Sequence, residues 1–205
     1  MRSIRVGVFA LLALIGATGC THTIAFDTDA TWHYRVGTPR QAGAALVAVI
    51  DEATLADTYD FRAFSTGIAQ KWVAQDGRML GQIADVEFPQ VVEFYQRSTT
   101  YKDPDRGDPR LTVVLSLPEY AFKDYRAKVR IHVEAFAPDR RLLLSKDYAG
   151  DGDSQAGRMI GLGAFGQKSA VRQSSLVAFR NAFDAMRADL IAIIATPSPD
   201  AASPR

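Results

Sequence analysis

The feature that most constrains the fold is a long amphipathic segment near the C-terminus. Between Gln167 and Ile194, apolar or small residues recur every three or four positions, which places them on one face of a helix. A helix of this length must bury that stripe against another layer of structure. The sequence therefore predicts a long C-terminal helix packed on a sheet. The stripe comprises Val171, Ser175, Ala178, Ala182, Met186, Leu190 and Ile193.

Three consecutive strands are predicted before this helix. Tyr125–Phe136 alternates with period two, so that Ile131 and Val133 face one side and His132 faces the other. This alternation is typical of an antiparallel strand with one solvated face. Leu111–Leu117 precedes it as a strand, and a tight turn leads into Arg141–Tyr148, which completes a hairpin.

The first half of the chain shows shorter patterns. Ala44–Ile50 is a continuous apolar run and predicts a buried strand. Phe61–Phe64 and Ala69–Ala74 could pair as short strands. Met79–Tyr95 has apolar residues at helical spacing, although Pro89 would kink that helix or force its start to about residue 88.

Together these elements predict an α+β fold, with a mainly antiparallel sheet packed by two helices. The expected order is strand, helix, three strands and a long C-terminal helix, within a single domain over 44–195. Residues 20–43 read as a tether with Thr, Gly and Pro, in which Trp32–Val36 could form an edge strand. The proline-rich residues 196–205 are expected to form a disordered tail.

The N-terminus has the organisation of a signal peptide over residues 1–19. Arg2 and Arg5 precede the apolar run Val6–Ile15, and small residues then lead to Cys20. The run has ten residues, whereas a membrane-spanning helix needs about 20. Export is therefore predicted, and an uncleaved spanning helix is not.

The stretch Ala17-Thr18-Gly19-Cys20 resembles the lipobox of bacterial lipoproteins, although Ala17 stands where leucine is most usual. The resemblance implies cleavage before Cys20 and attachment of diacylglycerol and a further acyl chain, such as palmitate, to that residue. Cys20 is the only cysteine, so no intrachain disulfide is possible. Thr21 follows, and the absence of aspartate there favours the periplasmic face of the outer membrane over the inner membrane.

The charge balance argues against a nucleic-acid partner. The chain has 24 basic and 23 acidic residues, and loss of Arg2 and Arg5 with the signal peptide leaves 22 basic residues against 23 acidic. A protein that binds nucleic acid through phosphate contacts needs a strongly basic surface. The mature chain is close to neutral.

No motif indicates a catalytic, metal or cofactor site. Gly161–Gly166 spells G-x-G-x-x-G but lacks the flanking strands of a dinucleotide site. The aspartates of 103–108 lack the glutamate of a calcium loop. His22, His33 and His132 are not at metal-ligand spacing. We expect no enzymatic activity and no cofactor, and a lipid-anchored periplasmic enzyme of unrecognised type is the alternative.

One segment suggests a contact surface. Apolar residues alternate with glycines in the predicted connector that ends at Gly166, where surface loops are normally polar. They could form a partner-binding centre with a basic rim at the start of the following helix. Alternatively, they cap the hydrophobic core. The candidate contact residues are Met159, Ile160, Leu162, Phe165, Lys168 and Arg172.

The lipobox and the order of elements together resemble the small envelope lipoproteins of the YajG-like and ABC-transport-auxiliary type. The resemblance covers most of the mature chain at the level of element order. It implies a membrane-anchored accessory protein with an envelope protein or a lipid as its partner. It identifies no site residues beyond Cys20.

Overall fold

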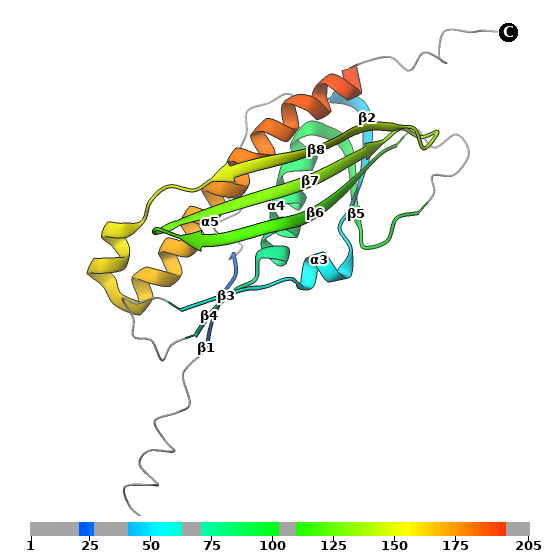
Figure 1. Ribbon diagram of the computed structural model, residues 1–205. Coiled ribbons are helices and arrows are strands. Elements are labelled where there is room, and N and C mark those ends of the chain that lie inside the picture. Colours follow the sequence, from blue (N-terminus) through cyan, green and yellow to red (C-terminus); the bar gives the residue numbers. More distant parts are fainter. Residues whose placement is uncertain (1–20, 27–40, 63–70, 103–109, 196–205) are drawn as a thin grey trace, which may run out of the picture.

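The computed structural model describes residues 21–26, 41–62, 71–102 and 110–195; for 41–42 and 160–165 it describes the backbone alone. The described elements form two sheets and the helices that pack on them (Figure 1). In chain order they are β1 (Thr21–Ile24), β2 (Gln41–Val49), α3 (Glu52–Ala56), β3 (Tyr59–Phe61), β4 (Lys71–Ala74), α4 (Asp76–Val91), β5 (Val92–Ser98), β6 (Leu111–Lys123), β7 (Arg126–Phe136), β8 (Leu142–Asp151) and α5 (Ala156–Ala195).

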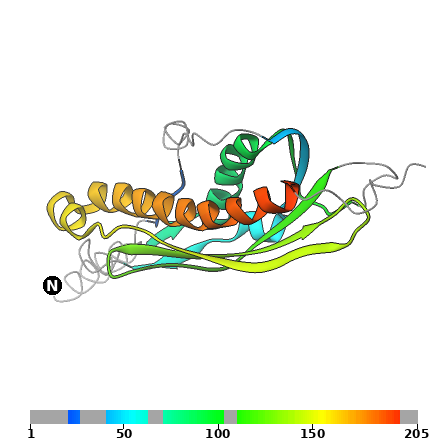
Figure 2. The ribbon, with the colours of Figure 1, turned by 90° about the horizontal axis from the view of Figure 1, so that it is seen from above.

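The larger sheet has five strands in the order β5-β2-β6-β7-β8. Helices α4 and α5 lie on the same face of it, as the view from above shows (Figure 2). The core lies between these two layers and is built from the inward side chains of the strands and the apolar stripe of α5. The chain therefore has the predicted α+β fold.

The alternation in β7 works as predicted. Ile131 and Val133 are fully buried against the helical layer, while His132 lies half-exposed on the opposite face. The approach of α5 to β8 also depends on Gly150, because a Cβ atom there would lie 2.0 Å from the backbone oxygen of Ala178. Glycine lets the helix pack directly on the strand.

The pairing within the sheet is mixed. Strands β6, β7 and β8 form the predicted antiparallel meander, but β2 lies between β5 and β6 and runs parallel to both. Leu46, Ala48 and Ile50 of this central segment are buried and Val47 is half-buried, which agrees with the buried strand predicted from the apolar run Ala44–Ile50. Parallel neighbours are joined by long crossover connections. Periodicity within one segment does not show which strands such crossovers bring together, so the sequence did not predict the parallel pairs.

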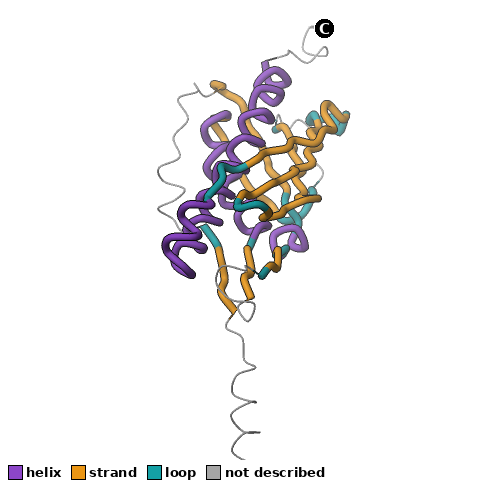
Figure 3. The backbone as a smooth tube through the Cα atoms, turned by 60° about the vertical axis from the view of Figure 1, so that its left-hand side comes forward, coloured by secondary structure: helices purple, strands orange, loops and turns teal. Residues whose placement is uncertain are grey.

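A second, three-stranded sheet has the order β1-β4-β3 and lies where the described chain begins (Figure 3). Strands β3 and β4 pair as predicted, with slightly shifted ends. Strand β1 corrects the predicted tether 20–43, since Thr21–Ile24 pairs with β4 and Ile24 is fully buried. Phe26 is also buried. The edge strand predicted at Trp32–Val36 and the tail 196–205 lie outside the described residues.

Helix α4 differs from its predicted boundaries. It begins at Asp76 and holds Pro89 in its last turn, so the proline marks the end of the helix and not its start. A proline there removes one backbone hydrogen bond just before the helix stops. The chain then enters the edge strand β5, whereas the sequence predicts that the helix continues to Tyr95.

Candidate functional site

The segment predicted to contact a partner does not form a loop. Helix α5 begins at Ala156, so residues 157–166 form its first turns and the connector shrinks to 152–155. The glycines alternate with methionine, leucine and alanine, which favour helix, and a glycine in a helix costs only about 1 kcal/mol relative to alanine. The prediction of a glycine-rich loop at 157–166 was wrong for this reason.

Two of the predicted contact residues serve the fold itself. Met159 is buried in the core, in agreement with the core-cap alternative. The Nε of Arg172 donates a hydrogen bond of 2.6 Å to the backbone oxygen of Ala25, which ties α5 to the chain after β1. Lys168 is exposed. The side chains of Ile160, Leu162 and Phe165 lie outside the described residues.

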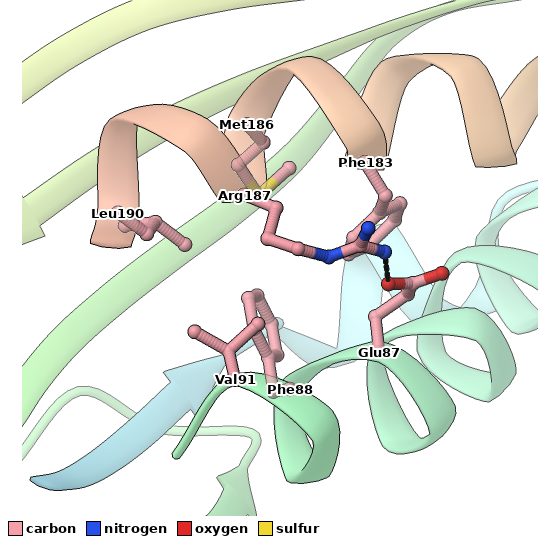
Figure 4. Close-up of a pocket in the computed structure, with 7 residues that line it drawn as sticks. All are labelled: Glu87, Phe88, Val91, Phe183, Met186, Arg187 and Leu190. Atoms are coloured by element: carbon pink, nitrogen blue, oxygen red, sulfur yellow. Dashed lines mark hydrogen bonds and ion pairs between the residues drawn. The ribbon is translucent and has the colours of Figure 1, made fainter. Parts of the chain in front are cut away.

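A shallow cleft separates α4 from α5 (Figure 4). It has no room for a water-sized molecule, so it does not form a small-molecule site. An ion pair between Glu87 and Arg187 lies at one side of it, and Arg187 also donates to Asp184 across 2.9 Å. The Glu87 and Arg187 side chains are only 2% and 11% exposed. The pair links the two helices, and sequence patterns gave no sign of it.

Ser174 and Ser175, two buried polar residues of α5, form hydrogen bonds with the sheet or the backbone beneath the helix. The hydroxyl groups of Tyr120 and Ser175 lie 2.7 Å apart, and Ser174 Oγ accepts from the backbone N–H of Ala127 at 2.8 Å. Ser174 in turn donates to the backbone oxygen of Asp153 at 2.9 Å. Burial raises the pKa of Tyr120 well above its usual value. These contacts fasten α5 to the β6–β7 hairpin.

Asp76 is a buried carboxyl group whose pKa is shifted upwards. Burial raises the pKa of its carboxyl group to about 6, and the nearby negative charge of Asp57 adds to the rise. Backbone hydrogen bonds from Asp76 itself, Gly77 and Tyr59 oppose the shift. The carboxyl group thus gains a proton in the folded state at a pH at which an unfolded aspartate has already lost it.

This shift predicts a pH-dependent penalty on folding. Between pH 3.8 and about 6, the folded chain holds a proton at Asp76 that the unfolded chain does not, so the free energy of unfolding falls as pH rises through this window. We expect Asp76→Asn to match the wild type near pH 4 and to exceed it by roughly 3 kcal/mol at pH 7. Urea unfolding at several pH values measures the difference. Asp57→Asn should keep most of the pH dependence, because burial is the larger cause; a gain from Asp76→Asn that is equal at every pH would contradict the assignment.

The outer face of the sheet carries a histidine between carboxylates. His132 Nδ1 lies 2.6 Å from Asp147 Oδ1, and its Nε2 lies 3.9 Å from Glu134 Oε1. Ser116 is the register partner of His132 on β6, so Ser, His and Asp occupy one row across three strands. Both ring nitrogens face carboxylates, so the row does not have the geometry of a base directed at a serine.

The described residues contain neither a metal-ligand cluster of three or more His, Cys, Asp or Glu nor a helix long and apolar enough to cross a membrane. No family model, curated protein or solved structure matches the chain. The function proposed below therefore rests on the sequence and the geometry alone.

Proposed function

We propose that this protein is a bacterial envelope lipoprotein, anchored through Cys20, that acts as a non-enzymatic accessory in envelope assembly or transport. The observation that carries the proposal is the position of β1. It begins at Thr21, directly after the predicted attachment residue, and Ile24 belongs to the core. Cleavage before Cys20 would keep this strand in the mature chain. The anchored domain sits directly on the membrane, with no spacer.

The edges of the larger sheet support a partner-binding role. Strands β5 and β8 form these edges, and each exposes a large apolar side chain. Phe94 is 61% exposed and Leu142 is 50% exposed. An open strand edge also presents unpaired backbone groups with which another protein can pair.

The anchor makes the first functional prediction. We expect Cys20→Ser to abolish acylation and to leave an unprocessed precursor, because the serine hydroxyl cannot form the thioether. Labelled palmitate and electrophoretic mobility measure both effects. Thr21→Ser is the matched control and should be acylated normally, whereas Thr21→Asp should move the protein to the inner-membrane fraction. Palmitate incorporated into the Cys20→Ser protein would overturn the proposal.

The proposed binding at the sheet edges gives the second functional prediction. A photoreactive residue in place of Phe94 or Leu142 should give discrete crosslinked species in intact envelopes, and the same residue in place of half-exposed His132 should give fewer. Equal yields at the three positions would count against binding at the edges. Recovery of the same products from a sample with dissolved membranes would show that the contact does not depend on the anchor.

A further inference from the structure

The position of β1 fixes which end of the domain faces the membrane. One residue of chain spans at most about 3.6 Å, so Thr21 must lie within a few ångströms of a lipid on Cys20. Thr21 is the register partner of Lys71, the first residue of β4. With the anchoring proposed above, on which this inference rests, this corner of the small sheet lies nearest the bilayer.

Two aromatic contacts between β3 and β6 show which end of the large sheet lies beside this corner. Strand β3 runs antiparallel to β4, so its last residue, Phe61, lies at the end where β4 begins. The rings of Tyr59 and Tyr120 are 5.5 Å apart, and those of Phe61 and Phe122 are 5.7 Å apart. Strands β3 and β6 therefore run in the same direction, and β6 ends near the corner that holds Thr21.

The turn that follows β6 consequently lies at the same end of the domain as the small sheet (Figure 1). It consists of Asp124 and Tyr125, and the start of α5 is held beside it, because the backbone N–H of Gln155 donates to the oxygen of Tyr125 at 2.9 Å. The opposite turn, between β7 and β8, lies at the other end of β7. The two turns are separated by the eleven residues of that strand, which corresponds to roughly 35 Å at 3.4 Å per residue.

The residues of the near turn are unusual for its geometry. Asp124 and Tyr125 have φ angles of 50° and 62°, a conformation for which such turns prefer Asn-Gly. A tyrosine at positive φ is strained, and strain of this kind is often retained for function. Tyr125 is 41% exposed, and Lys123 and Arg126 nearby are exposed too.

We propose that this turn is a membrane-contact site for phospholipid headgroups. The Tyr125 ring lies among the headgroups, with its apolar body towards the acyl chains and its hydroxyl group in the polar layer. Lys123 and Arg126 bind lipid phosphates, and their long side chains reach the interface. The lipid on Cys20 and this turn together hold the domain in one orientation, with the β7–β8 turn directed away from the bilayer.

Fluorophores at the two ends of the sheet test the orientation. The lipidated full-length protein is reconstituted in phosphatidylethanolamine–phosphatidylglycerol vesicles that contain spin-labelled lipid, which quenches only nearby fluorophores. Lys123→Cys and Arg141→Cys provide matched sites, since both replace an exposed basic residue beside a turn. Cys20 does not react with the label once its sulfur is in a thioether. We expect several-fold stronger quenching at position 123 than at position 141.

A second variant tests the tyrosine itself. Tyr125→Gly, added to Lys123→Cys, should weaken the quenching without lowering the melting temperature, because glycine adopts positive φ freely. Equal quenching at the two ends, on protein that floats with the vesicles, would overturn the orientation. Unchanged quenching in the Tyr125→Gly variant would overturn the role of the ring. Protein that fails to float would overturn the lipid anchor, and the inference with it.

Discussion

Replacement of Ile131 by aspartate is expected to unfold the domain. The side chain of Ile131 is fully buried at the centre of β7, against the helical layer. Its burial contributes about 1.5–3 kcal/mol, and an unpaired buried carboxylate costs several kcal/mol more. Single domains have only about 5–15 kcal/mol of stability in total. Loss of the cooperative transition in urea or on heating is therefore the expected result.

The matched control is the same substitution one residue along the strand. His132 lies on the outer face of the sheet, so His132→Asp introduces its charge into solvent. The change is not silent, since Asp147 and Glu134 face this position and would repel a third carboxylate. We expect a cost of about 1 kcal/mol, as for like charges on neighbouring strands. If both substitutions were equally damaging, the assignment of the two faces of β7 would be wrong.

Patterns confined to one segment were predictable from the sequence. The alternation in β7, the apolar run of β2 and the stripe of α5 each record burial within a few consecutive turns or pleats. For these three elements, the secondary structure and the buried residues were predicted correctly. Each is packed along most of its length, so its apolar pattern is long enough to be distinctive.

Elements defined by a distant partner were not predictable in this way. Strand β1 has four residues and becomes a strand only through its pairing with β4, which begins fifty residues later. Strand β5 follows α4 without a break, and Val91 and Phe94 fit helical spacing as well as a strand. The tertiary environment decides such edge strands more than local preference does.

The glycine-rich start of α5 shows a third kind of failure. Composition alone suggested a connector, but glycine only weakens a helix and does not prevent one. Met159 is buried there and lies in the core cluster, so packing outweighs that local penalty. The candidate contact set was accordingly predicted from a conformation that the chain does not adopt.

The ion pair between α4 and α5 gives the second large effect. Glu87 and Arg187 are 100 residues apart in sequence and are both nearly buried. Loss of one member of a buried ion pair typically costs about 3–5 kcal/mol. We expect Arg187→Met to destabilise the domain by this amount and Glu87→Leu to destabilise it by less, because Arg187 keeps its contact with Asp184. The urea midpoint measures both effects.

The double variant distinguishes loss of the charge interaction from loss of side-chain packing. Replacement of a buried ion pair by apolar groups of similar volume is often nearly neutral, so Glu87→Leu with Arg187→Met should be more stable than either single variant. The contact of Arg187 with Asp184 is the internal control. Asp184 is half-exposed, so Asp184→Asn should change stability by less than about 1 kcal/mol. A double variant that loses the sum of the two single effects would show that the two charges act independently, and that the cleft between α4 and α5 is held by its apolar residues instead.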